Sequence, residues 1–425
     1  MKKHKKILLI FIGVIFLILS FNNASAENIC ENPVYKNNDI LVKFKKKNIS
    51  ENYLNNFANL YNLKYSPEEN KLDRKGYFLF QSDSSESLQD KIKELKKDKP
   101  VKNAQPNYIF QTAKKKKKSK SSQDQYFNRE WWILNEGKYG VAGADLWLMG
   151  VWRQEQAVWP GVVIGVIDTG VSRTHADLKK NIVTGYDFVH GKSEMADKDG
   201  HGSFIAGLIA SQVNNRKGIA GLSRLDRLKI MPLKFDFSTD EAITAMAYAQ
   251  TRGVRILNMS WGTNEFDQAL YDAIQSYSGL VTAAAGNEGT EHADENHFYP
   301  CDFDLLNVIC VGASNENDQI AYYSDYGENV DLLAPGGTEE MPLISLDIKT
   351  NRYTEGLGTS FSTAFASGAA GLVLSANPSM SNQEIVDSII QNVRKKDELT
   401  GIVSSGGILN IKAAVNRENT VNSNP

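Results

Sequence analysis

Cysteine and long apolar runs are both scarce in this sequence, and each scarcity excludes a class of protein. Three cysteines in 425 residues indicate a chain that relies on an ordinary core rather than on a disulfide framework. The apolar run of residues 7–21 has 15 residues, whereas a transmembrane helix needs roughly 20. With 41% hydrophobic residues, the chain can bury a large core, which excludes a coiled coil or a wholly disordered protein.

The first 26 residues have the pattern of a signal peptide. Four lysines within residues 2–6 precede the apolar run, and Ala24-Ser25-Ala26 supplies the small residues that signal peptidase reads. We expect cleavage after Ala26 and secretion of the remaining chain, with no stable membrane span after processing. A retained membrane anchor is the alternative, and the shortness of the run argues against it.

The net charge of −2 hides an asymmetry along the chain. Residues 27–125 carry 21 basic and 13 acidic side chains, whereas residues 126–425 carry 23 basic and 37 acidic ones. An acidic main body argues against nucleic acid as a partner. Its expected electrostatic partner is the basic segment just upstream.

Residues 27–113 have the pattern of a small α+β domain. Strands are expected at 39–44, 76–81 and 107–111, and amphipathic helices at 50–62 and 85–97. This order of elements predicts a ferredoxin-like arrangement.

A linker is expected at residues 114–125, because Lys114 to Lys118 are five consecutive lysines followed by serines. Like charges repel one another and stay solvated, so this stretch should be an exposed target of proteolysis. A nucleic-acid or membrane-surface patch is the alternative interpretation. The polar residues 416–425 are expected to form a disordered tail.

Between residues 126 and 415, short apolar runs alternate with helical patterns. Strands are expected at 162–167, 228–233, 255–260, 280–285 and 308–313, and helices at 203–211, 240–251, 266–276, 361–376 and 381–394. This alternation predicts an α/β domain with a mostly parallel sheet that is covered on both faces. Functional groups gather at the carboxyl ends of the strands in such sheets.

Three motifs carry residues suited to acid–base and nucleophilic chemistry. Asp168 ends a strand in Val-Ile-Asp-Thr-Gly, His201 lies in Asp-Gly-His-Gly-Ser, and Ser360 lies in Gly-Thr-Ser at the start of an apolar helix. Asp168 alone would also suit an aspartic protease, but that mechanism needs a second Asp-Thr/Ser-Gly, which the sequence lacks. A structural histidine and an ordinary helix cap are the alternative interpretations of the other two.

Asn287, in Ala-Ala-Ala-Gly-Asn-Glu-Gly, is a fourth candidate, since its amide is a donor beside a glycine turn. Together the four residues supply an orienting carboxylate, a base, a nucleophile and an oxyanion donor. The helix that starts near Ser360 adds free N–H groups and positive potential. The order Asp, His, Asn, Ser excludes the α/β-hydrolases, in which the serine comes first.

In the order and spacing of these motifs, residues 126–415 resemble the subtilisin-like serine proteases. The separations are 33 residues from Asp168 to His201 and 159 residues from His201 to Ser360. The resemblance implies a three-layer α/β/α fold and a serine endopeptidase. It implies that Asp168 orients His201, that His201 takes the proton of Ser360, and that Asn287 stabilises the oxyanion.

The resemblance also implies where a peptide substrate binds. An extended peptide would pair with a strand and lie beside a neighbouring glycine turn. The residues in question are Ser260, Trp261, Gly262, Ala285 and Gly286.

Residues 27–113 resemble the inhibitor and chaperone propeptide of that family, which ends much like Ala104-Gln-Pro-Asn-Tyr108. A zymogen that processes itself is therefore expected. A pseudoprotease that binds peptides without cutting them is the alternative, and the four intact residues argue against it. Ser203, Phe204 and Ala364 stand where the family usually has Thr, His and Pro, but none is a proton-transfer position.

A structural calcium ion is implied by the resemblance as well, because oxygen ligands of the matching kind suit calcium. A polar surface turn is the alternative. The matching positions are Asp177, Val213, Asn215, Lys217 and Ile219.

The pocket for the residue before the scissile bond is expected between residues 260–262 and 284–287. Acids just beyond it would favour cationic substrates, although they would equally suit a solvated loop. In a third interpretation, Phe298 narrows the pocket and favours small residues. The four acids are Glu288, Glu291, Asp294 and Glu295.

Cys301 and Cys310 are nine residues apart, and they form either a local disulfide or two buried thiols. Cys30 would be lost together with the upstream segment.

Overall fold

The computed structural model of the chain describes residues 35–46, 48–67, 76–82, 87–108, 111–112, 126–293, 296–348 and 352–418. The predicted signal peptide, the predicted lysine-rich linker and most of the predicted tail lie outside these residues. No helix within the described ranges combines the length and the hydropathy that crossing a bilayer requires.

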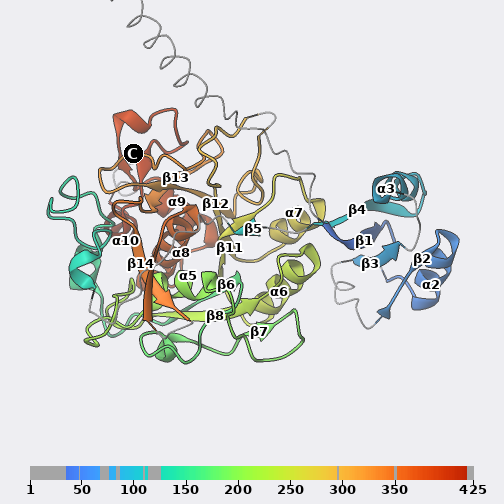
Figure 1. Cartoon of the computed structure of the whole chain (residues 1–425), viewed down its shortest axis with the longest axis horizontal. Coiled ribbons are helices and arrows are strands. Elements are labelled where there is room, and N and C mark those ends of the chain that lie inside the picture. The colour runs from blue at the N-terminus through green and yellow to red at the C-terminus, as the bar shows by residue number, and fades with distance from the viewer. Residues whose placement is uncertain are drawn as a thin grey trace, which may run out of the picture. The chain divides into compact units, whose positions relative to one another are not determined.

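A nine-stranded sheet forms the centre of the main body, residues 126–418 (Figure 1). Its pairings are parallel except that of the edge strand β16 (Arg394–Lys395) with β17 (Gly407–Ile408). The order continues with β13 (Leu332–Pro335), β12 (Val308–Ser314), β11 (Leu280–Ala284), β9 (Ile256–Met259), β6 (Val162–Asp168), β8 (Leu228–Lys234) and β7 (Tyr186–Asp187).

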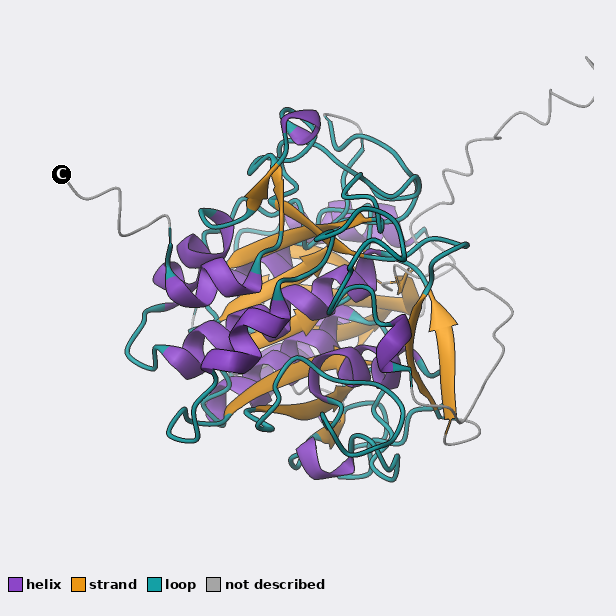
Figure 2. Cartoon of the chain, turned by 90° about the vertical axis from the view of Figure 1, so that its left-hand side faces the viewer, coloured by secondary structure: helices purple, strands orange, loops and turns teal. Residues whose placement is uncertain are grey.

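Both faces of this sheet are apolar, because successive side chains of a strand point to opposite sides. In β6, Ile164 and Val166 join the hydrophobic cluster on one face, and Ile167 joins the cluster on the other. The first cluster includes α4 (Leu148–Gln154), α5 (His201–Ala210), α8 (Thr359–Ala376), α9 (Asn382–Ile390) and α10 (Ile411–Asn416), and the second includes α6 (Thr239–Thr251) and α7 (Gln268–Gln275). Helices thus flank the strands on both sides (Figure 2), which confirms the predicted three layers.

Two short pairings lie outside the large sheet. One is the antiparallel hairpin of β14 (Leu343–Asp347) with β15 (Arg352–Gly356). The other joins β10 (Trp261–Gly262) of the main body to β5 (Gln111–Thr112), which precedes it by about 150 residues in the chain. This second pairing links the N-terminal part of the chain to the region of the predicted site.

The N-terminal module, residues 35–108, has its own sheet and core. Its elements are β1 (Tyr35–Phe44), α2 (Glu51–Leu60), β2 (Leu63–Lys64), β3 (Tyr77–Ser82), α3 (Leu88–Lys96) and β4 (Val101–Tyr108). The strands form an antiparallel sheet in the order β2-β3-β1-β4, and both helices contribute to the core beneath it. This is the predicted ferredoxin-like topology, although the sequence pattern indicates three strands and does not show β2.

The last strand of this module differs from its prediction. The sequence pattern predicts a strand at 107–111, whereas β4 already begins at Val101 and ends at Tyr108. Pro106 makes the sequence pattern untypical of a strand, because proline is unfavourable within a sheet. β4 is an edge strand, so the absent N–H of Pro106, which lies opposite Ile40, is tolerated.

Candidate active site

Three of the predicted catalytic residues lie at the ends of neighbouring elements. Asp168 is the last residue of β6, His201 is the first residue of α5, and Ser360 is the second residue of α8. β6 lies between β8 and β9 in the sheet, and α5 and α8 pack against each other on one of its faces. The carboxyl edge of the parallel sheet therefore gathers these side chains.

Asp168 and His201 form a buried hydrogen-bonded pair. His201 Nδ1 lies 2.8 Å from Asp168 Oδ1 and 2.9 Å from Oδ2, and both side chains are fully buried. The Thr169 N–H also donates to Asp168 Oδ1, at 2.8 Å. Because a carboxylate only accepts, Nδ1 carries the proton and Nε2 is the basic nitrogen. Nε2 has no hydrogen-bond partner among the described residues.

Ser360 is held near this pair by α8. Its hydroxyl donates to the carbonyl oxygen of Ser260 at 2.9 Å, and the Ser260 hydroxyl donates to the Ser360 carbonyl oxygen at 2.8 Å. The His201 ring lies against the ring of Phe361, the residue after Ser360, with the two centroids 6.2 Å apart. The fold thus joins Asp168 to His201 and places the residue after Ser360 against the His201 ring, whereas the Ser360 hydroxyl is hydrogen-bonded to Ser260 and not to His201 Nε2.

The Asn287 side chain is oriented by the residue that precedes the serine. Its Oδ1 accepts a hydrogen bond from the Thr359 N–H at 2.9 Å and another from the Thr359 hydroxyl at 3.1 Å. The amide oxygen is thereby engaged, and the Nδ2 group remains as a donor. Sequence reasoning does not single out Thr359, although its position next to Ser360 is a signal that could have done so.

Gly286 makes the turn before Asn287 possible. Its φ is +116°, and a Cβ at this position would lie 2.1 Å from Asp325 Oδ2. Both the conformation and the close approach therefore require glycine. The preceding Ala285 is fully buried.

The predicted substrate-binding strand is β10. Its backbone pairs with β5, whereas the Trp261 side chain points into the core. The Trp261 side chain is fully buried, and its Nε1 donates to the Ile167 carbonyl oxygen at 2.7 Å, so it belongs to the core. In the antiparallel pairing of β5 with β10, Trp261 lies opposite Thr112 and Gly262 lies opposite Gln111.

The three departures from the usual pattern lie in packed positions. Ser203 Oγ accepts a hydrogen bond from the Ser172 N–H at 2.8 Å and so fixes a loop. Phe204 stacks on Phe361 with centroids 4.1 Å apart, and Ala364 is fully buried in α8. Their structural roles are packing and loop anchoring.

The residues predicted as calcium ligands converge on Asp177. Its carboxylate contacts the side-chain amide of Asn215 and accepts hydrogen bonds from the Ile219 N–H at 3.0 Å and the Tyr353 hydroxyl at 3.1 Å. Burial raises the pKa of Asp177 to about 6 in spite of these hydrogen bonds. Tyr353 has no counterpart in the sequence prediction, because it lies 176 residues away in the chain.

Two further predicted ligands, Val213 and Lys217, were expected to contribute backbone carbonyls. Lys217 N–H donates to Asn215 Oδ1 at 2.7 Å, and the Lys217 side chain is exposed. Val213 is half-buried and packs on the core. Of the loop from Val213 to Ile219, Asn215 and Ile219 contact Asp177, and both present N–H groups to it, so the set of oxygen ligands stays a prediction.

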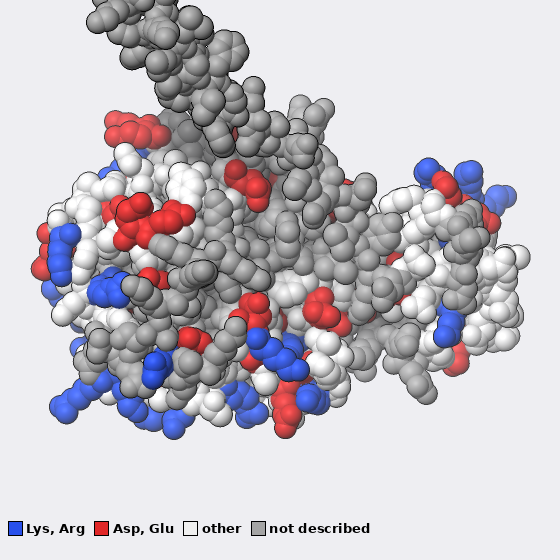
Figure 3. All heavy atoms as spheres, viewed as in Figure 1, with Lys and Arg blue, Asp and Glu red and all other residues white. Residues whose placement is uncertain are grey.

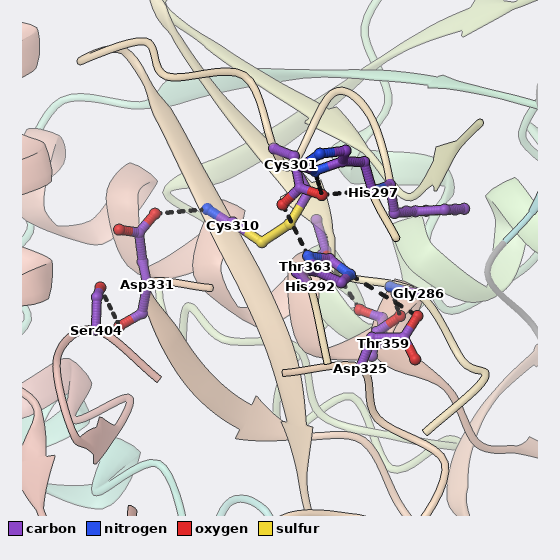
Figure 4. The surroundings of a disulfide bond; sticks show 12 residues. Gly286, His292, His297, Cys301, Cys310, Asp325, Asp331, Thr359, Thr363 and Ser404 are labelled. Carbon is purple, nitrogen blue, oxygen red and sulfur yellow. Dashed lines mark hydrogen bonds and ion pairs between the residues drawn. A yellow bond between two sulfur atoms is a disulfide. The ribbon is translucent and has the colours of Figure 1, made fainter. Parts of the chain in front are cut away.

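A disulfide joins Cys301 to Cys310 in β12 (Figure 4). His292 and Asp302 lie beside it, with His292 Nδ1 2.7 Å from Asp302 Oδ1. His292, Cys301 and Asp302 are close enough to share a metal ion, but the Cys301 sulfur is bonded to Cys310 and is not a thiolate.

His292 also links this cluster to the turn that carries Asn287. Its Nε2 lies 3.9 Å from Asp325 Oδ2, a distance that suits an ion pair rather than a hydrogen bond. Asp325 Oδ1 in turn accepts hydrogen bonds from the backbone N–H groups of Glu288 at 3.0 Å and Thr290 at 2.8 Å. Figure 4 shows His292 between the disulfide and Asp325.

Comparison with known proteins defines the class. Residues 160–408 match the subtilase family (peptidase S8), and residues 22–107 match the fervidolysin N-terminal prodomain. The first match alone covers more than half of the chain, so the chain belongs to the subtilase family. It is a serine endopeptidase that is preceded by a prodomain.

Individual relatives agree with this class. The thermophilic serine proteinase of Bacillus sp. (strain AK1) is 31% identical over 310 residues, which are 72% of this chain and 70% of that one. Thermitase of Thermoactinomyces vulgaris is 33% identical over 263 residues, 60% of this chain and 88% of that one.

Among solved structures, fervidolysin of Fervidobacterium pennivorans, a keratinolytic enzyme related to subtilisin, shares the fold. The TM-score is 0.69 at 20% identity, over 90% of this chain and 61% of that one. This chain therefore spans about three-fifths of the fervidolysin chain.

The pH dependence of stability should report the charge of His292. Burial by itself lowers the pKa of His292, but the carboxylates of Asp302 and Asp325 outweigh burial and raise the pKa to about 9. An unfolded histidine has a pKa of about 6.5. The stabilisation is therefore complete below about pH 6.5 and is lost as the pH rises towards 9. We expect a loss of roughly 1–3 kcal/mol in the free energy of unfolding across that window.

Urea unfolding at each pH would measure this loss. The Ser360→Ala variant is used because the substitution prevents self-digestion. His292→Asn in the same background should flatten the profile between pH 6.5 and 9. His190→Asn is the matched control, because His190 is half-exposed and pairs with Asp187 at 3.0 Å. An unchanged slope in the His292→Asn protein would contradict the assignment.

Proposed function

We propose that the chain is the precursor of a secreted serine endopeptidase that cuts peptide bonds with a triad of Asp168, His201 and Ser360. The buried pair carries the proposal, because the Nδ1 proton is committed to Asp168 and Nε2 is left to accept the proton of Ser360. Asp168 then stabilises the imidazolium that forms as Ser360 attacks the peptide carbonyl. Secretion is proposed from the signal pattern of residues 1–26, which lie outside the described residues.

We assign the oxyanion hole to the Nδ2 group of Asn287 and the backbone N–H of Ser360, because the neighbouring N–H groups of Thr359 and Phe361 donate to Asn287 Oδ1 and to the Gly358 carbonyl oxygen. Thr359 supports this assignment, since it holds the Asn287 oxygen and so commits the other amide group to donation. The first N–H groups of a helix have no partner within the helix, and they carry positive potential. An oxyanion that forms beside Ser360 would meet both donors.

A fluorophosphonate probe tests the nucleophile directly. We expect the probe to label Ser360 in the mature enzyme and to label neither Ser360→Ala nor His201→Ala. Turnover of a peptide substrate should fall by about 10⁴–10⁶ in these variants, the range known for subtilisin itself.

Ser362→Ala is a matched control for this experiment. Ser362 lies on the same helix and is fully buried, and its hydroxyl donates to the Ala334 carbonyl oxygen at 2.9 Å. This variant should keep its labelling. Undiminished hydrolysis by Ser360→Ala would refute the triad.

We further propose that the propeptide inhibits the enzyme by covering β10. β5 already pairs with the edge of β10 that an extended peptide would use. β4 of the module also reaches the N-termini of two helices of the main body. Asn107 Nδ2 donates to Asp240 Oδ1 in α6 at 2.9 Å, and Gln105 Oε1 accepts from the Ala269 N–H in α7 at 3.0 Å.

We propose that the attraction between the propeptide and the main body comes from individual charged pairs. The Lys43 ammonium group contacts Asp272 of α7, and the Tyr77 hydroxyl donates to the same carboxylate at 3.1 Å. On the face that Figure 3 shows, acidic and basic side chains are interspersed rather than gathered into patches of one sign. Local pairs such as Lys43–Asp272 would therefore set the register of the propeptide.

The pairing of β5 also suggests where the precursor cuts itself. The ladder ends with Thr112 opposite Trp261, one residue short of Ser260. The carbonyl oxygen of Ser260 accepts a hydrogen bond from the Ser360 hydroxyl. The next residue in the sequence is Ala113, so we propose the bond between Ala113 and Lys114, of which the structure describes neither residue.

N-terminal sequencing of secreted protein tests self-processing. The wild-type enzyme should begin at Lys114 or within the lysine-rich stretch that follows it. The Ser360→Ala precursor should stay full length after removal of the signal peptide and begin at Glu27. Trimming of the Ser360→Ala precursor in a host without other extracellular proteases would show that another enzyme makes the cut.

We propose a structural calcium ion at Asp177. The burial of this carboxylate supports the ion, because desolvation raises the pKa of Asp177 to about 6 and a bound cation would offset that cost. To bind the ion, Asn215 would turn its Oδ1 away from the Lys217 N–H, and the carbonyls of Val213, Lys217 and Ile219 would complete a set of oxygen ligands. The ion would tie the loop from Val213 to Ile219 to the core and take no part in proton transfer.

Thermal unfolding with and without calcium tests this site. We expect calcium to raise the Tm of Ser360→Ala protein and a chelator to lower it. A ligand at a hundred times its Kd adds about 2.7 kcal/mol to the free energy of unfolding. Asp177→Asn should remove the calcium effect, whereas Glu194→Gln, at an exposed acid, should keep it. A calcium effect that survives Asp177→Asn would place the ion elsewhere.

A further inference from the structure

An aromatic ring lies between the two segments that bound the predicted substrate pocket. Phe298 is 7% exposed and packs on Ala284. A Cβ on Gly262 would lie 2.5 Å from Phe298 Cε1, and a Cβ on Gly286 would lie 3.5 Å from Phe298 Cγ. The ring therefore lies against the backbone of both segments.

We propose that Phe298 fills this pocket and restricts the residue before the scissile bond to small side chains, namely glycine, alanine and serine. The inference rests on the proposed function, since it takes β10 as the strand that binds the substrate. The volume that a large substrate side chain would need is already occupied by the ring. Protein interiors are close-packed, so the two cannot share that volume.

The ring is also held in place through its backbone. The Phe298 N–H donates to Asp302 Oδ2 at 2.7 Å, and the Asp302 N–H donates to the Phe298 carbonyl oxygen at 3.1 Å. Thr263 and Tyr299 exchange two backbone hydrogen bonds of 2.8 Å on the other side. The adjacent Cys301 is tied to β12 by the disulfide seen in Figure 4. A substrate would have to break this anchoring to push the ring aside.

Of the four predicted acids near the pocket, those that the structure describes point to solvent rather than into the pocket region. The side chains of Glu288 and Glu291 are exposed, whereas Asp294 and Glu295 lie outside the described residues. The buried acid behind Gly286 is Asp325, and its carboxylate is already engaged by His292 and by backbone N–H groups. Phe298 itself offers no charge to a lysine or arginine.

The sequence at the proposed self-cleavage site agrees with a small-residue preference. The residue before the proposed bond is Ala113, even though five lysines follow it directly. An enzyme selective for basic residues would have several such bonds next to this one. The junction therefore fits a pocket that Phe298 has shortened.

Peptides that differ only at the residue before the scissile bond test the inference. We expect the mature wild-type enzyme to cleave an alanine peptide with at least tenfold higher kcat/KM than a phenylalanine or lysine peptide. Single methylene groups already change kcat/KM by roughly 10–200-fold in apolar pockets. Phe298→Ala should raise kcat/KM for the phenylalanine peptide tenfold or more, because the cavity it leaves accepts the ring of the substrate.

Phe303→Ala is the matched control. Phe303 is an equally buried aromatic residue of the same region, but it packs on Tyr299, Tyr271 and Phe266 rather than on Gly262. This variant should keep the wild-type ranking of the peptides. If Phe298→Ala fails to fold, mass spectrometric mapping of the cuts that wild-type enzyme makes in a denatured protein decides the question, with small residues enriched before the cut.

The outcomes separate this inference from the proposed function. Labelling of Ser360 by fluorophosphonate together with a preference for phenylalanine would overturn the role of Phe298 alone. A preference for lysine or arginine would also overturn it, and would point to the acids. Absence of both labelling and cleavage would overturn the proposed function and this inference with it.

Discussion

Four consecutive residues, 260–263, hold together the parts of this protein on which its proposed chemistry depends. The first exchanges hydrogen bonds with Ser360, and the second anchors its indole on the carbonyl of Ile167, next to Asp168. The backbone of 261–262 pairs with β5, and residue 263 pairs with Tyr299. A displacement of this segment would therefore move the proposed nucleophile, the proposed substrate strand and the proposed pocket wall together. Its position must be fixed before any of these features can act.

The candidate site is built mostly from buried polar groups, and apart from His201 Nε2 they are held by hydrogen bonds. Burial of an unpaired carboxylate or imidazole is costly, so Asp168 and His201 are stable in the interior because they satisfy each other. Asn287 and Thr359 form a second such pair at the neighbouring turn. Because these partners are held before a substrate arrives, the donors need no reorganisation during the reaction. The same interactions that stabilise the fold thus prepare the site.

Much of the fold could be predicted because its signals are local. The apolar strands and the motifs around Asp168, His201 and Ser360 each lie within a few residues of sequence, and their order along the chain restricts the topology. The bounds of β4 were harder to predict, because Pro106 is untypical of a strand. It is the pairing with β1 that defines where this edge strand begins. The short strands at the β16 edge carry too few residues to show a period.

The contacts of the site were less predictable than its members, because they join distant segments. Tyr353 reaches Asp177 across 176 residues, and Thr359 reaches Asn287 across 72. The direction of the Trp261 side chain could not be predicted either. A strand of two residues is too short to show the alternation of apolar and polar side chains that indicates which face is buried. Such details depend on packing between layers, which a single sequence does not display.

The shortness of β10 has a consequence for the enzyme in solution. An unpaired strand edge is a general hazard, because it can template the addition of strands from other chains and so promote aggregation. β10 has only two residues, Trp261 and Gly262, and so offers too few backbone hydrogen bonds to hold a foreign strand unaided. If β10 binds the substrate as we propose, a cut peptide that lacks further contacts would be released for the same reason. An edge of this length therefore favours rapid exchange of peptides over permanent pairing.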